Sequence, residues 1–127
     1  HVNRAPVSGE VVATSYHKGQ FLNANLDKAS EKNERQNMVL QCRDGQKIGV
    51  VQIAGLVARR ILLETAIGDK LSIGQQFGII RFGSRVDVWV PATVPVLVLA
   101  GQKTIAGETV IADLSGVISE PTQLSER

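Results

Sequence analysis

The chain has 127 residues, of which 43% are hydrophobic and 20% charged, a balance typical of one soluble globular domain. A net charge of +2 and a pI near 8.9 are too mildly basic to indicate nucleic-acid binding, and 4% aromatic residues exclude the stacking surfaces of single-strand binders. A single cysteine, Cys42, excludes an internal disulfide framework and a cysteine-based zinc site, and two histidines without suitably spaced carboxylates argue against a metal centre.

Targeting signals are not visible in the sequence. No apolar run reaches the roughly 18 residues that a membrane-spanning helix needs, and no signal peptide is visible, although a targeting or anchoring segment could lie upstream. The chain begins without Met and already in strand-like alternation. We therefore expect a processed piece or fragment, a partial domain that lacks an upstream segment.

The first half of the chain alternates between apolar and polar residues in short segments, which predicts β-strands. The first such segment runs from Val7 to Tyr16, and a polar loop with one helical turn is expected over Asn23–Lys32. A second strand is expected over Arg35–Cys42, followed by a hairpin turn at Asp44-Gly45.

The next run, "KIGVVQIAGLVARRIL", predicts one or two buried strands bent near Gly55, with a helix over "GLVARRILLETA" as the alternative. Strands are also expected in "FGIIRFG" and "VDVWVP", on either side of a Gly83-Ser84 bend. Twelve glycines and many β-branched residues over short strands predict a mainly β barrel or sandwich, a single domain over residues 1–127 with short helical turns.

Two segments, "GDKLSIGQQFGII" and "GQKTIAGETVIA", share a turn–Gly–apolar pattern that recurs in the β-sandwiches of biotinyl and lipoyl carriers. Those carriers present a lysine on a hairpin tip. Lys70 and Lys103 lack that context, so the pattern indicates a related architecture rather than a carrier function.

Ser84 is a weak catalytic candidate on spacing alone. It lacks the G-x-S-x-G elbow of serine hydrolases, and neither His1 nor His17 is close to it in the sequence. A turn or surface hydroxyl is the simpler interpretation.

Two groups of arginines suit bidentate binding of phosphate or carboxylate. They are Arg59-Arg60 and the pair Arg81 and Arg85, which flanks the Gly-Ser bend. Solvated strand edges are the alternative interpretation.

Five stretches, in order over nearly the whole chain, carry a family resemblance: "HVNRAPVSGEV", "YHKGQFLNANLDKASEKNER", "VVQIAGLVARRI", "IGQQFGIIRFGSRVDVWVP" and "AGETVIADL". Together they resemble the phosphatidylserine decarboxylase family, especially its short bacterial and archaeal branch. "NER", "QIAGLVARRI" and "FGSRVD" are the most specific of these motifs.

The resemblance implies that the protein cuts itself between Gly83 and Ser84, giving a β chain of residues 1–83 and an α chain of residues 84–127. Ser84 attacks the Gly83 carbonyl, the ester undergoes β-elimination, and residue 84 becomes a pyruvoyl group, the covalent cofactor. Its ketone forms a Schiff base with phosphatidylserine, and loss of CO₂ gives phosphatidylethanolamine. The protein is thus expected to be a pyruvoyl-dependent carboxy-lyase.

A proton carrier is also implied by the resemblance. His1 matches the first histidine of the family's H-x-x-H-x-P segment and is expected to act as general acid/base, whereas Arg4 replaces the second. The acidic partner belongs to an upstream segment that this sequence does not contain. For His17 an exposed turn position is favoured, and for Asp87 a role in orienting the site and a strand-edge salt bridge are both open.

The resemblance further assigns Arg85 and Arg81, then Arg59 and Arg60, to the lipid phosphate or serine carboxylate. It implies a peripheral protein on the cytoplasmic face of a bacterial or archaeal membrane, with the two cleaved chains associated and a homo-oligomer left open. The alternatives are a non-processing lipid-binding or carrier-like module, and a pyruvoyl decarboxylase for another amine such as archaetidylserine.

Overall fold

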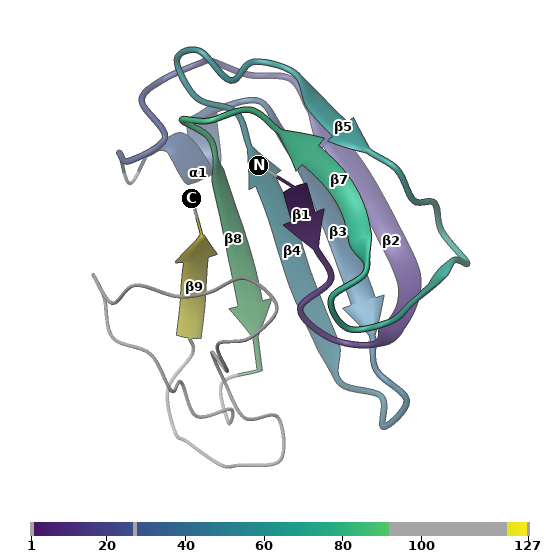
Figure 1. The fold of residues 1–127 in the computed structure, drawn as a ribbon. Helices are drawn as coiled ribbons and strands as arrows, with labels where there is room; N and C mark the ends of the chain where they lie inside the picture. Colours follow the sequence, from purple (N-terminus) through teal and green to yellow (C-terminus); the bar gives the residue numbers. More distant parts are fainter. Residues whose placement is uncertain (1, 27, 92–121, 127) are drawn as a thin grey trace.

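Two antiparallel sheets that face each other make up the fold, as Figure 1 shows for the computed structural model, which describes residues 2–26, 28–91 and 122–126. The mainly β prediction is confirmed. The elements in chain order are β1 (Val2–Arg4), β2 (Gly9–His17), α1 (Ala29–Lys32), β3 (Arg35–Gln41), β4 (Lys47–Ile53), β5 (Ile61–Leu63), β6 (Lys70–Leu71), β7 (Gln76–Ile80), β8 (Arg85–Val90) and β9 (Thr122–Glu126).

The larger sheet has six strands in the order β6-β2-β3-β4-β8-β9, and the smaller has three in the order β1-β7-β5. The smaller sheet covers one face of the larger, which curls around it as an open half-barrel (Figure 1). The buried side chains of the two sheets form one cluster. Consecutive strands β7 and β8 belong to different sheets, so the chain crosses from one layer to the other between Ile80 and Arg85.

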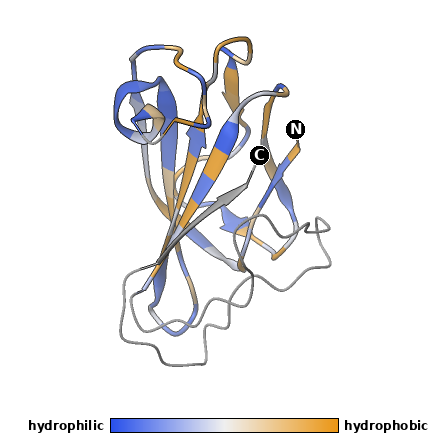
Figure 2. Cartoon of the chain, turned by 90° about the vertical axis from the view of Figure 1, so that its left-hand side faces the viewer, coloured by the Kyte–Doolittle hydropathy of each residue, from blue (hydrophilic) through white to orange (hydrophobic). Residues whose placement is uncertain are grey.

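The alternation of residues along the strands explains which face each strand buries (Figure 2). In β3, Met38 and Leu40 point inward, and in the neighbouring β4, Ile48 and Val50 do the same. Side chains two residues apart share one face of a strand, so this period of two buries an apolar row from each strand. The fully or nearly fully buried core residues are Ala5, Val11, Met38, Leu40, Ile48, Val50, Ala58, Leu71, Phe77, Ile80, Val86 and Val88.

The predicted turns lie where the sequence indicated. Gly45 adopts φ = +90° in the β3–β4 turn, which the N–H of Cys42 closes by donating to the Gln46 carbonyl at 2.8 Å. The loop expected around residues 23–32 contains the single turn of helix α1.

The strand interpretation of residues 47–62 is confirmed as two separate strands, of which β4 is largely buried and β5 is not, and the helical alternative is wrong. Strand β4 ends at Ile53, an irregular loop follows over residues 54–60, and β5 then pairs with β7. Within the described part of the chain, no helix is long and apolar enough to cross a membrane. The likeness to biotinyl and lipoyl sandwiches stays a prediction.

Truncating a core side chain of the central strand should destabilise the fold. Leu40 is fully buried between the sheets, so Leu40→Ala is expected to lower the free energy of unfolding by about 2 to 5 kcal/mol. Ile67→Ala is the matched control, because Ile67 is 63% exposed and its truncation should change stability by no more than about 0.5 kcal/mol. Urea denaturation followed by circular dichroism measures both, and equal losses would contradict this description of the core.

Candidate active site

The connection between β7 and β8 places the Gly83–Ser84 peptide bond in a tight turn. Residues 81–84 make the whole crossing between the two sheets, with the turn centred on Phe82 and Gly83. Gly83 has φ = +88°, a left-handed conformation that side chains rarely adopt. A Cβ built on Gly83 would meet no atom within 4 Å, so it is the backbone conformation, not lack of space, that requires glycine here.

Ser84 is buried at the end of this turn, with 4% of its surface exposed. Its hydroxyl donates a hydrogen bond to the Arg81 carbonyl oxygen at 2.7 Å, which closes the turn from the side-chain side. A buried hydroxyl next to the carbonyl of a glycine in a left-handed turn places a nucleophile beside a peptide group that no side chain shields.

Arg85 and Asp87 form a buried ion pair directly after Ser84. The Arg85 Nε lies 2.9 Å from Asp87 Oδ1, and Nη2 donates to Oδ2 at 3.1 Å. Nη1 donates to the main-chain carbonyls of Ala24 and Leu26 at 2.9 and 3.3 Å. This arrangement joins the loop before α1 to the start of β8.

The ion pair bears on two expectations. The role of Arg85 as a substrate ligand stays a prediction, and in the structure this residue is only 7% exposed, with its guanidinium bound to interior groups. The salt bridge of Asp87 is present, yet not at a strand edge, because β8 lies between β4 and β9. Arg85 and Asp87 are buried because both side chains point to the same face of β8, which the loop around Ala24 covers.

Arg59, Arg60 and Arg81 are exposed, and they lie in loops rather than on strand edges. Arg59 is held in place: its Nε donates to the Leu56 carbonyl at 2.9 Å, and its guanidinium carbon lies 4.9 Å from the centre of the Phe21 ring. Such a cation–π contact fixes the side chain without neutralising its charge.

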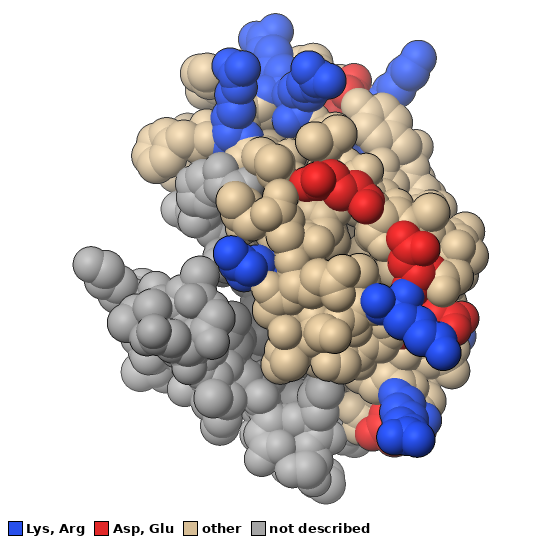
Figure 3. All heavy atoms as spheres, turned by 45° about the vertical axis from the view of Figure 1, so that its right-hand side comes forward, with Lys and Arg blue, Asp and Glu red and all other residues tan. Residues whose placement is uncertain are grey.

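An open hollow of about 450 Å³ borders the Gly83 turn. Two of its lining side chains, Val57 and Phe82, are 80% and 83% exposed, which is unusual for large apolar residues. In Figure 3, Lys and Arg side chains gather at the upper end of the molecule, the end at which Figure 1 draws the β4–β5 and β7–β8 connections. The hollow is lined by Asn23, Leu56, Val57, Arg81, Phe82 and Gly83.

Asn33 is a site-supporting residue that the analysis of single side chains missed. It is fully buried, and its side chain accepts from the Leu22 N–H at 2.9 Å and donates to the Leu22 and Ala54 carbonyls at 2.8 and 2.7 Å. It thereby ties the loop before α1 to the loop after β4. The sequence signal that could have found it is a polar residue just before an alternating strand, in the family motif "NER".

The histidines do not complete a catalytic arrangement within the described residues. His1 lies outside them. His17, at the end of β2, is partly exposed, and the register of the sheet puts β3 and β4 between it and Arg85. Arg4 pairs with Gln76 at the start of β7, and its Nη1 donates to the Gly74 carbonyl at 2.9 Å. A guanidinium offers only hydrogen-bond donors, so Arg4 lacks the acceptor nitrogen that a histidine at this position would supply.

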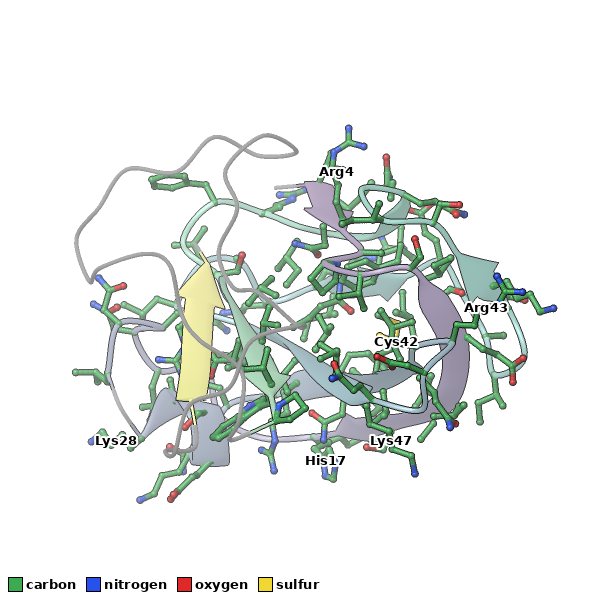
Figure 4. All side chains as sticks on the ribbon, turned by 90° about the horizontal axis from the view of Figure 1, so that it is seen from below. Arg4, His17, Lys28, Cys42, Arg43 and Lys47 are labelled. Carbon is green, nitrogen blue, oxygen red and sulfur yellow. The ribbon has the colours of Figure 1, made fainter. Side chains whose placement is uncertain are left out.

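Groups with shifted pKa values lie outside the Gly83 turn. The Cys42 pKa is raised, chiefly by burial and then by the nearby Asp44 carboxylate. Figure 4 shows Cys42 and Lys47 near the β3–β4 turn at the lower end of the molecule.

The Tyr16 pKa is raised because its hydroxyl donates to the Glu34 carboxylate. The Asp69 pKa is lowered by hydrogen bonds from the Ala66 N–H and the Thr65 hydroxyl. Among the described residues no cluster of His, Cys, Asp or Glu could hold a metal ion.

Comparison with known proteins identifies the family of this chain. The profile described as phosphatidylserine decarboxylase matches residues 1–112. The chain belongs to the phosphatidylserine decarboxylase family. It is 58% identical over 115 residues to a phosphatidylserine decarboxylase proenzyme of Saccharopolyspora erythraea, covering 91% of this chain and 49% of that protein. With the proenzyme of Ruegeria pomeroyi it is 56% identical over 114 residues, covering 90% and 52%.

A third relative, the proenzyme of Mycolicibacterium smegmatis, is 54% identical over 115 residues, covering 91% of this chain and 50% of that protein. The chain therefore spans about half the length of these curated relatives. No solved structure matches the chain significantly. Membership of the phosphatidylserine decarboxylase family confirms the resemblance seen in the motifs.

Removing one partner of the buried ion pair should destabilise the site strongly. Asp87→Asn leaves the Arg85 guanidinium buried without a counter-charge, so the free energy of unfolding should fall by about 3 to 5 kcal/mol. Glu31→Gln on exposed α1 is the control and should shift it by at most about 0.5 kcal/mol. Chemical denaturation measures the free energy of unfolding of both variants. A decrease of less than about 1 kcal/mol for Asp87→Asn would show that the ion pair is not buried as described.

Proposed function

We propose that this protein is a phosphatidylserine decarboxylase that matures by cutting its own chain between Gly83 and Ser84. Family membership supports the reaction class, and the names of the relatives as proenzymes support maturation. The observation that carries the proposal is the turn itself. It presents a buried serine hydroxyl beside the carbonyl of a glycine held at φ = +88°.

Self-cleavage would begin with attack of the Ser84 Oγ on the Gly83 carbonyl carbon. A C–O bond forms, the C–N bond breaks, and the hydroxyl proton passes to the nitrogen, which gives an ester and a free amine. Removal of the Ser84 α-proton then expels the Gly83 carboxylate and leaves dehydroalanine. Tautomerisation and hydrolysis with water release ammonia and leave a pyruvoyl group at position 84.

The surroundings of residue 84 are compatible with a pyruvoyl group at that position. Ser84 is buried, and its neighbour Gly83 lines the open hollow, which supports a position for residue 84 close to a surface that a substrate could reach. The pyruvoyl ketone would supply a site for the substrate amine and an electron sink when CO₂ leaves.

His1 is our proposed general acid/base, and it lies outside the described residues. A proton donor is needed once CO₂ has left, and imidazole titrates close to neutral pH. Asp87 is poorly suited to this task, because its carboxylate is fully buried and bound to Arg85.

Arg81 is our first candidate for the substrate's phosphate or carboxylate, followed by Arg59 and Arg60. Arg81 lines the hollow beside Gly83, and all three are exposed, whereas the Arg85 guanidinium is bound internally. Guanidinium groups bind phosphate and carboxylate with paired hydrogen bonds. We propose that Arg85 instead holds the start of β8 in place.

We further propose that the upper end of the molecule docks on the cytoplasmic face of the membrane. Apolar side chains flanked by arginines match the two parts of an anionic bilayer surface, its acyl boundary and its headgroups. After cleavage the pieces 1–83 and 84–127 should stay associated, because β8 pairs with β4 from Gly49↔Trp89 to Ile53↔Arg85.

The cleavage proposal predicts two pieces from the protein expressed from its complete gene. Intact mass should show a break after Gly83, and the piece that starts at residue 84 should resist Edman degradation because it has no amine. Ser84→Ala should remain one chain without decarboxylase activity, whereas Ser72→Ala, in an exposed turn, should split normally. An uncut wild-type chain with an ordinary serine at 84, in an active preparation, would refute self-processing.

The membrane proposal predicts weaker binding to vesicles when the exposed apolar side chains are removed. In a Ser84→Ala background, which leaves the lipid unchanged, Val57→Ser with Phe82→Ser should reduce binding to phosphatidylserine vesicles by roughly tenfold or more. Ile67→Ser removes a similarly exposed apolar side chain elsewhere and should have little effect. Vesicle sedimentation measures the affinities, and equal binding by the two variants would overturn the assignment of this surface.

A further inference from the structure

Gly55 lies directly against the carbonyl group of Gly83. A Cβ built on Gly55 would stand 2.0 Å from the Gly83 oxygen and 3.1 Å from its carbonyl carbon. Contacts shorter than 3.0 Å are essentially never made by real Cβ atoms, so no residue with a side chain fits at position 55 without moving Gly83. The two glycines thus serve different needs: Gly83 requires the left-handed backbone, and Gly55 requires empty space.

The backbone that carries Gly55 is fixed on both sides. The Gly55 N–H donates to the Ala58 carbonyl at 3.1 Å, and the Ala54 N–H donates to the Glu34 carbonyl at 3.0 Å. The Ala54 carbonyl accepts from the buried Asn33 side chain at 2.7 Å. Because these bonds restrain residues 54 and 55, a group added to Gly55 would displace the Gly83 carbonyl rather than the loop after β4.

We propose that Gly55 is a positioning residue for self-cleavage, which sets the orientation of the Gly83 carbonyl toward the Ser84 hydroxyl; this inference rests on the proposed function. The peptide group is planar, so contact of its oxygen with Gly55 fixes the plane of the Gly83–Ser84 bond. The direction from which Ser84 Oγ can approach the carbonyl carbon is fixed with it.

The same contact bears on the charge that the first step creates. When Oγ bonds to the Gly83 carbon, the carbonyl π electrons move to the oxygen, and they return when the C–N bond breaks. That oxygen lies where a side chain at position 55 would stand, so glycine leaves its movement unobstructed.

Gly55→Ala in the protein expressed from its complete gene tests this inference. Splitting after Gly83 should slow by roughly a hundredfold, the usual effect of misplacing a reacting group by about 1 Å. The matched control is Gly9→Ala, whose Cβ would stand 2.7 Å from the Gln41 carbonyl oxygen, a similar backbone clash that does not involve Gly83. Gly9→Ala should split at the wild-type rate in whatever fraction folds, as followed by intact mass over time.

Hydroxylamine shows which step is affected. It attacks an ester at Gly83, leaving a Gly83 hydroxamate and a chain that begins with Ser84 and its free amine. Folded Gly55→Ala should yield hydroxamate roughly a hundredfold more slowly than wild type, since the acyl shift is the step that is slowed. Hydroxamate formation at the wild-type level, or splitting at the wild-type rate, would overturn the inference.

A second variant keeps the test decisive if Gly55→Ala does not fold. Asn33→Ala frees the Ala54 carbonyl and lets residue 55 move, while leaving space beside Gly83. Its folded fraction should split at least tenfold more slowly than wild type at equal fractions folded, and wild-type splitting by this variant would overturn the inference. A wild-type chain that never splits would instead remove the proposed function, so the two failures are distinguishable.

Discussion

The ion pair between Arg85 and Asp87 is the contact on which the geometry of the Gly83–Ser84 turn depends. Both side chains belong to β8, and the same guanidinium reaches the carbonyls of Ala24 and Leu26. Because Arg85 directly follows Ser84, the first residue of β8 cannot shift without breaking these bonds. A buried pair of this kind adds little net stability, but it makes alternative positions of the chain unfavourable.

The loops beside the turn are also held by neutral hydrogen bonds, which the Asn33 side chain makes to main-chain groups. Asn33 bonds to both polar groups of Leu22 and to the carbonyl of Ala54. The loops before α1 and after β4 therefore form one surface, against which the Gly83 carbonyl lies. Buried polar side chains with all bonds made are rigid, and this rigidity suits a reaction within one peptide unit, where small rotations decide whether attack is possible.

Much of the fold could be predicted from alternation and turn residues, because each strand buries one face and each turn needs a particular backbone. The strands around Met38 and Ile48, and the turn at Gly45, are examples. The order of strands across two sheets could not be predicted, since pairings such as that of β1 with β7 join distant segments.

The candidate site, like the fold, could be predicted from the sequence only in part. Gly83 and Ser84 could be found because a family motif marks them, although spacing alone gave them little weight. The burial of Arg85 could not be predicted, since sequence shows the charge of a residue but not the layer into which its side chain points. The space-filling role of Gly55 had no local signal, because the atom that excludes a side chain there comes from a residue far along the chain.

The pairing of Gly49 with Trp89 has a practical consequence. Trp89 is the only tryptophan in the chain, and its side chain lies over Gly49, where a Cβ would stand 3.3 Å from that of Trp89. Trp89 is about half exposed, so the wavelength of its fluorescence emission depends both on the solvent and on its contact with β4. Intrinsic fluorescence at this one position therefore observes the seam between β4 and β8 directly, without any label, in cut and uncut molecules alike.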